Sequence, residues 1–188
     1  MSRDRLAPRD WTRAALLALA EGGVGAVKVD VLARELGVTR GSFYWHFSDR
    51  DALLKAALEQ WEQESTERVI KDLDQVENPA ERLERLVRGA FSDETVPGLQ
   101  PALMAHARHP VVMPVLRRVT AQRIGYITAI YRELGLDSTA ARRRAVIAYA
   151  AYLGWLDLRR GPEDAVPEVM PDGEAPAVID DIVTMLLN

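Results

Sequence analysis

The sequence predicts an all-α protein, and three observations support this fold class. Apolar residues recur at helical spacing along most of the chain, no segment alternates strictly as a half-buried strand would, and Gly or Pro residues separate the periodic stretches. Of the 188 residues, 48% are hydrophobic and 28% are charged, which is ordinary for a globular chain. We expect an N-terminal three-helix domain over residues 1–50 and a larger helical domain over 51–188.

The first helix is predicted to begin after Pro8 and to end at Gly22-Gly23. Its buried face repeats at positions i, i+3, i+4, i+7 and i+8, occupied by Trp11, Ala14, Ala15, Ala18 and Leu19.

Two short helices follow. The first contains Val29, Leu32 and Leu36, and Gly37 lies where a left-handed C-terminal cap is expected. The Thr39 hydroxyl can cap the next helix, which we expect over 40–46.

A longer helix is predicted from Ser48-Asp49-Arg50-Asp51, a capping box in which Ser48 caps and Asp51 reaches back. It continues through Leu53, Leu54, Leu58 and Trp61.

The rest of the chain predicts further helices that are separated by Pro and Gly. One helix is expected to begin at Asn78-Pro79, and a short one near Leu99. A long helix begins before Leu116 and ends at Gly135, and another is capped by Ser138 and ends at Gly161-Pro162. Residues 161–176 hold four prolines and five acids without Lys or Arg, so we expect a mobile loop there. A final amphipathic helix is expected over 176–187.

Composition narrows the function classes. The chain has no cysteine, which excludes disulfides, thiolate metal sites and cysteine nucleophiles, and fits a reducing cytoplasmic compartment. The N-terminus is charged where a signal peptide is apolar, and the longest apolar run, 145–156, is shorter than the roughly 20 residues that span a bilayer. We therefore expect a soluble cytoplasmic protein. The net charge is −4, but residues 1–55 hold nine Lys/Arg against seven Asp/Glu.

The stretch from Val29 to Phe47 carries the functional prediction. It contains two short helices joined by a Gly-containing turn, and the second is dense in polar and aromatic side chains, the pattern of a helix-turn-helix. Such a helix fits a major groove about 12 Å wide. A Gly turn between two helices can also be an ordinary structural corner, but the run from Gly41 to Phe47 places Tyr, Trp and His around the helix, which favours DNA binding.

At these residues the chain resembles the tetracycline-repressor (TetR) family. The family signature runs close to Ile-Ala-x-x-x-Gly-Val-Ser-x-Gly-Thr-Leu-Tyr-x-His-Phe-x-x-Lys, and the matching residues here are Leu32-Ala33, Gly37-Val38-Thr39, Gly41-Ser42-Phe43-Tyr44, His46-Phe47 and Arg50. Two positions differ. Lys28 stands where the family has a capping hydroxyl residue, and Arg50 replaces a lysine, which keeps the charge and changes the geometry.

The candidate DNA-binding residues combine hydrogen-bonding groups with small residues that let the backbone approach. They are Lys28, Thr39, Arg40, Gly41, Ser42, Tyr44, Trp45, His46 and Arg50. Arg40 can pair bidentately with guanine, whereas Tyr44 and His46 can reach phosphates. We assign Trp11, Phe43 and Phe47 to the core of the small domain instead.

The resemblance also implies a homodimer that binds a pseudo-palindromic operator and is released by a small apolar or aromatic effector. The last two long helices, about 138–160 and 176–187, would form a four-helix bundle with the partner. Aromatic and Met side chains could line the effector pocket, although core packing explains each equally well: Trp61, Phe91, Met104, Met113, Tyr126, Tyr149 and Tyr152.

Alternatives stay open at this stage. A DNA-binding regulator without effector fits the same motif, while an enzyme is disfavoured because the chain has no nucleophile elbow, Walker loop, dinucleotide fingerprint or zincin motif. His106 and His109 could share a metal, but no third ligand is evident, so we predict neither metal nor cofactor. Arg142-Arg143-Arg144 is interpreted as a solvated helix face.

Overall fold

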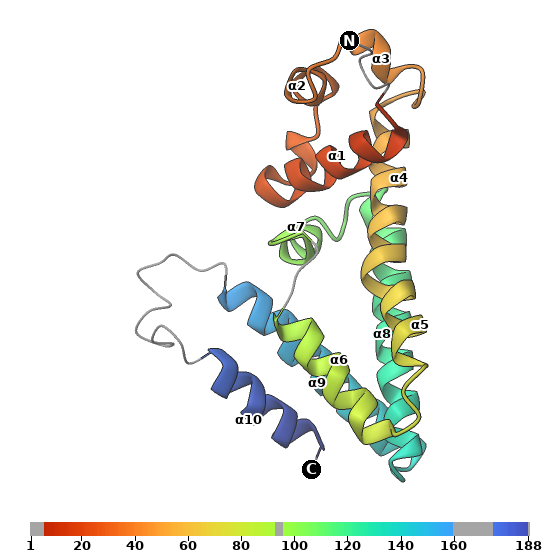
Figure 1. Ribbon diagram of the computed structural model, residues 1–188, viewed down its shortest axis with the longest axis vertical. Helices are drawn as coiled ribbons and strands as arrows, with labels where there is room; N and C mark the ends of the chain where they lie inside the picture. The colour runs from red at the N-terminus through yellow and green to blue at the C-terminus, as the bar shows by residue number, and fades with distance from the viewer. Residues whose placement is uncertain (1–5, 93–95, 160–174, 188) are drawn as a thin grey trace. The chain divides into compact units, whose positions relative to one another are not determined.

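The computed structural model describes residues 6–92, 96–159 and 175–187, and these residues form helices without any strand (Figure 1). This confirms the all-α prediction. The α-helices are α1 (Pro8–Gly22), α2 (Val29–Glu35), α3 (Arg40–Phe43), α4 (Arg50–Glu62), α5 (Arg68–Leu73), α6 (Pro79–Ser92), α7 (Leu99–Ala105), α8 (Val112–Glu133), α9 (Ser138–Leu158) and α10 (Ala175–Leu187). A 3₁₀ turn (Val24–Ala26) follows α1, and a π-helical turn (Gln63–Glu67) joins α4 to α5.

The chain forms two compact units. The first contains Met1–Ser65 and Val96–Arg118, and the second contains Thr66–Thr95 and Val119–Asn188. Helices α4 and α7 therefore belong to the same unit as the predicted helix-turn-helix. The predicted domain boundary between residues 50 and 51 stays a prediction.

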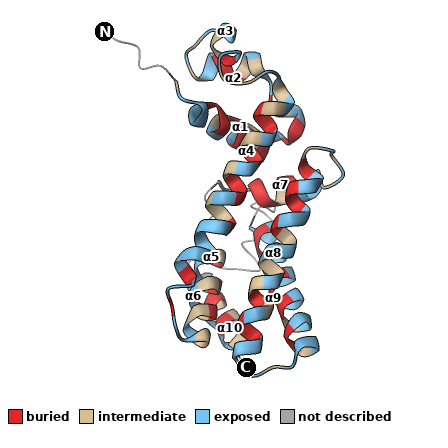
Figure 2. Cartoon of the chain, turned by 90° about the vertical axis from the view of Figure 1, so that its right-hand side faces the viewer, coloured by how far each residue is buried: buried red, intermediate tan, exposed pale blue. Residues whose placement is uncertain are grey.

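The core of the first unit is built from the apolar face of α1 and from α4, and Figure 2 shows buried positions along both helices. Trp11 and Phe43 are fully buried and meet edge to face, with ring centroids 5.4 Å apart, while Phe43 stacks on Phe47 at 5.7 Å. The assignment of these three aromatic residues to the core of the small domain agrees with this geometry.

Two helix caps differ by one residue from the prediction. The cap of α4 is Asp49 rather than Ser48, because the Asp49 carboxylate accepts the Ala52 N–H at 2.8 Å. The cap of α9 is Asp137 rather than Ser138, and it accepts the N–H groups of Thr139 and Ala140. A carboxylate one residue earlier or later satisfies the same orphan amides, so neighbouring cap-forming residues compete.

The C-cap residue of α1 is Gly23, whose backbone lies at φ 67° and ψ −166°, a region that residues with a side chain avoid. The imidazole of His106, just after α7, lies against this glycine: a Cβ at position 23 would lie 2.2 Å from His106 Cε1. The ring is held there because its Nδ1 lies 2.9 Å from the Ala102 carbonyl oxygen. Gly23 thus permits both the turn and the close packing of α7 on α1.

A buried carboxylate lies at the end of α4. Glu62 has a side chain that is 11% exposed, and it accepts two hydrogen bonds from Arg118 of α8, at 3.1 Å from Nε and 2.6 Å from Nη2. This bidentate ion pair fastens the last turn of α4 to the part of α8 that belongs to the first unit.

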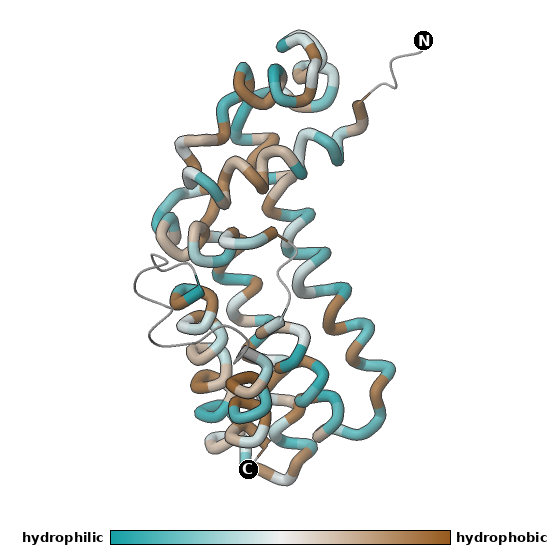
Figure 3. Tube along the Cα trace, turned by 60° about the vertical axis from the view of Figure 1, so that its left-hand side comes forward, coloured by the Kyte–Doolittle hydropathy of each residue, from teal (hydrophilic) through white to brown (hydrophobic). Residues whose placement is uncertain are grey.

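In the second unit α6, α9 and α10 bury their apolar faces against one another and against α8. Figure 3 shows hydrophobic and hydrophilic positions following one another turn by turn along these helices, as amphipathic helices require. The Trp155 indole N–H donates to the Phe91 carbonyl oxygen at 2.9 Å, and the Tyr131 hydroxyl donates to the carbonyl oxygen of Leu186.

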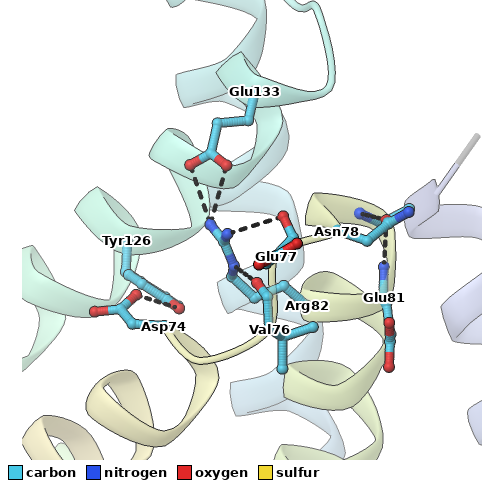
Figure 4. Close-up of polar contacts among 9 residues, drawn as sticks. Asp74, Val76, Glu77, Asn78, Glu81, Arg82, Tyr126 and Glu133 are labelled. Atoms are coloured by element: carbon cyan, nitrogen blue, oxygen red, sulfur yellow. Dashed lines mark hydrogen bonds and ion pairs between the residues drawn. The ribbon is translucent and has the colours of Figure 1, made fainter.

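A polar cluster fixes the connection between α5 and α6 to the end of α8 (Figure 4). The guanidinium of Arg82 donates to both carboxylate oxygens of Glu133, at 3.1 and 3.0 Å, and to the Val76 carbonyl oxygen at 2.9 Å. Asn78 caps α6 by accepting from the N–H groups of Ala80 and Glu81, as its place before Pro79 suggests.

Several helix bounds differ from the prediction. α3 ends at Phe43 rather than at 46, α7 ends at Ala105, and α8 begins at Val112 with Pro114 in its first turn, where proline is tolerated. The predicted loop at 161–176 lies outside the described residues except for its last two positions, which begin α10. Among the described residues no helix is both long and apolar enough to cross a membrane.

Candidate nucleic-acid interface

The turn between α2 and α3 is stabilised by backbone hydrogen bonds that need a glycine. Gly37 lies at φ 68°, its N–H donates to the Arg34 carbonyl oxygen at 3.1 Å, and the Val38 N–H donates to that of Ala33 at 2.9 Å. This is the left-handed cap that the sequence predicts at Gly37. It orients α3 against α2.

Phe43 determines which side chains of α3 remain outside. Because Phe43 is fully buried, the neighbouring positions face solvent: Tyr44 is 53% exposed and Trp45 is 78% exposed. Two large aromatic side chains exposed at adjacent positions form an apolar patch, and such patches often mark an interaction site.

Arg40 is held in place from two sides. Its Nε lies 3.4 Å from a carboxylate oxygen of Asp30 on α2, and its Nη2 donates to the Tyr44 hydroxyl at 3.2 Å. The guanidinium carbon also lies 5.9 Å from the centre of the Tyr44 ring. The hydrogen bond to Tyr44, and then the charge of Asp30, raise the pKa of Arg40 above its ordinary value, so the guanidinium is charged at every relevant pH.

Arg50 has a different environment. Its Nε donates to the Val27 carbonyl oxygen at 2.7 Å, its Nη2 donates to the carbonyl oxygen of Val24, and its Nη1 pairs with Asp51 at 3.4 Å. The side chain is 37% exposed. The guanidinium therefore ties the start of α4 to the segment before α2, which leaves fewer donors for phosphate than the sequence suggests.

The remaining predicted DNA-binding residues lie around the two helix starts. Lys28 and Thr39 are exposed at the N-cap positions of α2 and α3, and neither side chain makes a capping hydrogen bond. For Lys28 this agrees with the expectation that a lysine cannot cap, whereas the prediction that the Thr39 hydroxyl caps α3 is wrong. Gly41 is exposed, while Ser42 and His46 are half-buried.

The predicted effector-lining residues are divided between the units. Phe91, Tyr149 and Tyr152 lie together in the second unit: the Tyr152 ring lies 5.9 Å from that of Phe91 and 6.0 Å from that of Tyr149. Trp61 is buried in the first unit, where Met104 and Met113 are each 41% exposed. The Tyr126 hydroxyl donates to Asp74 at 3.0 Å (Figure 4), and burial together with this carboxylate raises the pKa of Tyr126 above its ordinary value.

Sequence reasoning missed three residues of these sites. Asp30 approaches Arg40 from another helix, Trp155 adjoins Phe91 at 5.9 Å, and Arg123 lies 5.9 Å from the Tyr152 ring while its Nε donates to Thr66 at 2.9 Å. The spacing of Tyr149, Tyr152 and Trp155 on one helix could have indicated the cluster.

Within the described part of the chain, no three His, Cys, Asp or Glu residues form a group suited to a metal, and His106 packs on Gly23 instead.

These features define a helix-turn-helix protein with a helical body. Residues 12–63 match the family model described as bacterial regulatory proteins, tetR family. Over 63 residues the chain is 40% identical to the HTH-type transcriptional regulator SrpR of Pseudomonas putida, a match that covers 31% of this chain and 30% of that protein. The chain thus spans under a third of the length of this curated relative.

Solved structures resemble the whole chain. A TetR transcriptional regulator from Legionella pneumophila has a TM-score of 0.78 at 12% identity and covers 100% of both chains. A transcriptional regulator from Rhodococcus sp. Rha1 has a TM-score of 0.72 at 22% identity, covering 97% of this chain and 96% of that one. At these identities the likeness concerns the fold. The segment 12–63 is thus similar to the DNA-binding part of TetR-family regulators, and the fold of the chain resembles that of solved TetR-family regulators.

These relatives are all described as transcriptional regulators. This supports the expectation that the chain is not an enzyme.

Proposed function

We propose that this protein is a dimeric, ligand-responsive transcriptional repressor that binds operator DNA through α3 and is cytoplasmic, at the nucleoid. The observation that carries the proposal is the surface of α3, where buried Phe43 leaves Arg40, Tyr44 and Trp45 exposed beside a small Gly41. The Arg40 guanidinium suits a contact with a base edge in the major groove, and the Tyr44 hydroxyl suits a contact with a phosphate.

The first test is selection of bound duplexes from a random pool. A dimer should select a pseudo-palindromic site with half-sites about one helical turn, ~34 Å, apart or slightly more. Arg40→Ala should then reduce the preference at one base position by roughly 5- to 150-fold, whereas Tyr44→Ala should weaken binding to all duplexes alike. If no motif is selected, the assignment as a sequence-specific regulator is wrong.

A second element of the proposal is dimerisation through α9 and α10. Apolar side chains on these helices face solvent in the single chain: Val146 is 46% exposed, Ile147 62%, Leu158 57% and Met185 68%. Ala150, Ala151 and Gly154 are also exposed on α9, so a partner helix could approach closely. An exposed apolar surface of this kind favours contact with a partner, and the family resemblance makes a second copy of this chain the expected partner.

Ile147→Lys tests this interface by placing a charge on it. The variant should sediment as a monomer at micromolar concentration while keeping its helical circular dichroism. Val69→Lys is the matched control, because Val69 is also a solvent-exposed apolar residue, 38% exposed, but lies on α5. If both variants sediment as the unmodified protein does, α9 is not the interface.

The third element is release by a small apolar or aromatic effector. Support comes from the cluster of Phe91, Tyr149, Tyr152 and Trp155 in the second unit. Regulators of similar fold have been solved with acyl-CoA ligands, namely FadR from Bacillus subtilis in complex with stearoyl-CoA and AibR in complex with isovaleryl coenzyme A and operator DNA.

A thermal-shift screen followed by titration against the operator complex tests effector release. A coupling of about 1–3 kcal/mol would weaken operator binding by roughly 5- to 150-fold. The same rings are tightly buried, with Phe91 2% and Tyr149 5% exposed, which favours the second candidate, a regulator without effector. Ligands that bind but leave operator affinity unchanged would support that second candidate.

A further inference from the structure

An acidic side chain lies on the surface that is proposed to meet DNA. Asp30, in the first turn of α2, has a side chain that is 71% exposed, and its carboxylate lies 3.4 Å from Nε of Arg40, whose side chain is 60% exposed. The Tyr44 hydroxyl accepts from the other edge of the same guanidinium at 3.2 Å. Arg40 is therefore engaged by two groups, from α2 and from α3, before any DNA arrives.

A carboxylate at this place opposes DNA binding in two ways. It repels the phosphates, and it neutralises the cation that would otherwise attract them. The pair adds little to folding stability, because both partners are exposed to water. We therefore expect this pair to lower affinity for DNA in general without a matching gain in stability, and discrimination between sequences is the property that it can improve.

We propose that Asp30 is a specificity-determining positioning residue that acts through Arg40. In complexes with unrelated DNA, Asp30 keeps the guanidinium from making a phosphate contact. A guanine edge offers two uncharged acceptors, O6 and N7, in the geometry of the guanidinium fork, so it can pair with Arg40 without the repulsion between the Asp30 carboxylate and a phosphate. Asp30 thereby widens the ratio of operator affinity to random-DNA affinity. The inference rests on the proposed DNA-binding function.

The test compares Asp30→Asn with a matched control, Glu35→Gln. Both variants remove one negative charge from α2, but Glu35 lies in the last turn of the helix and is exposed. Asp30 also lies near the positive end of the helix dipole, so Asp30→Ser serves as a second neutral variant that suits a helix start. Thermal unfolding of all variants verifies that the fold is retained.

Two probes are needed: a duplex selected from a random pool by the unmodified protein, and a scrambled duplex of equal length and composition. Asp30→Asn should bind the scrambled duplex more tightly, with a salt dependence steeper by about 0.9 for each additional phosphate that the variant neutralises. The ratio of affinities for selected and scrambled duplexes should fall by roughly 5-fold or more, the lower limit of what one bidentate guanine contact contributes. Glu35→Gln should leave that ratio unchanged.

The same comparison in an Arg40→Ala background tests whether Asp30 changes the affinity ratio through Arg40. If Asp30 acts through Arg40, Asp30→Asn changes the ratio no further in that background. The inference is overturned if Asp30→Asn and Glu35→Gln tighten both duplexes by equal factors, or if the effect of Asp30→Asn persists without Arg40. If the unmodified protein selects no duplex at all, the proposed function fails, which is a distinct outcome.

Discussion

The packing of His106 on Gly23 predicts that Gly23→Ala destabilises the first unit. The backbone of Gly23 lies at φ 67° and ψ −166°, and a Cβ there would lie 2.2 Å from His106 Cε1 and 2.7 Å from Nε2. Both distances are far below van der Waals contact, so the imidazole must move. Because the ring is anchored through Nδ1 to the Ala102 carbonyl oxygen at 2.9 Å, its displacement breaks this hydrogen bond.

The expected cost has two parts. Holding alanine in this backbone region costs about 1–3 kcal/mol. Losing the bond to Ala102 costs about 0.5–1.5 kcal/mol. We therefore expect Gly23→Ala to lower the free energy of unfolding by about 1.5–4.5 kcal/mol, and to lower the Tm by roughly 3–18 °C for a chain of this size.

Urea and thermal unfolding followed by circular dichroism measure this change. Gly25→Ala is the control two residues away, because nothing lies within 4 Å of a Cβ at Gly25 and its φ is not positive. A double variant with His106→Ala separates the two parts, since without the imidazole only the backbone cost of alanine at position 23 remains. If Gly23→Ala and Gly25→Ala unfold at the same urea concentration, the reasoning about Gly23 is refuted.

Three further predictions concern single side chains. Arg50→Lys should keep the charge yet destabilise the protein, because one ammonium cannot replace the fork that donates to Val24 and Val27; a lysine variant as stable as arginine in urea would contradict this. The hydrogen bond from the Ala52 N–H is the main cause that lowers the pKa of the Asp49 carboxyl in the folded protein. The charged carboxylate therefore stabilises the fold fully above the ordinary carboxyl pKa of about 3.9, and this stabilisation is lost as the pH falls through the lowered pKa. Asp49→Ala should therefore be less stable than the unmodified protein at pH 7 but not in strong acid, while Asp49→Asn keeps the cap; unfolding in urea across pH measures both. Arg82→Met should cost about 1–3 kcal/mol in urea unfolding because Glu133 loses its partner, and an unchanged midpoint would show that the pair is fully solvated.

Much of the fold could be predicted because helical periodicity is local. Trp11, Ala15 and Leu19 are all buried on α1, as their spacing indicates, and Gly37 adopts the positive φ that its place after Leu36 suggests. The caps were displaced by one residue at Asp49 and Asp137, because each of them adjoins a serine that could cap equally well.

The unpredicted features depend on contacts between distant positions. Arg50 stays a candidate DNA-binding residue, but the sequence did not indicate that its donors meet carbonyl groups 23 and 26 residues earlier, which become available only where the backbone after α1 turns. The pairing of Asp30 with Arg40 likewise requires the crossing of α2 and α3, which no periodicity reveals. The π-helical turn at Gln63–Glu67 has no sequence signal that we recognise.

The four tryptophans differ sharply in their surroundings, and this difference provides a built-in optical probe. Trp11, Trp61 and Trp155 are 0%, 5% and 6% exposed, whereas Trp45, beside the α3 recognition surface, is 78% exposed. Acrylamide should therefore quench the emission of Trp45 far more than that of the other three. The difference in emission between the unmodified protein and Trp45→Phe is the emission of Trp45, on the candidate DNA-contacting surface. Protection of this emission from quenching when a duplex is added would report that the surface is occupied, without any label.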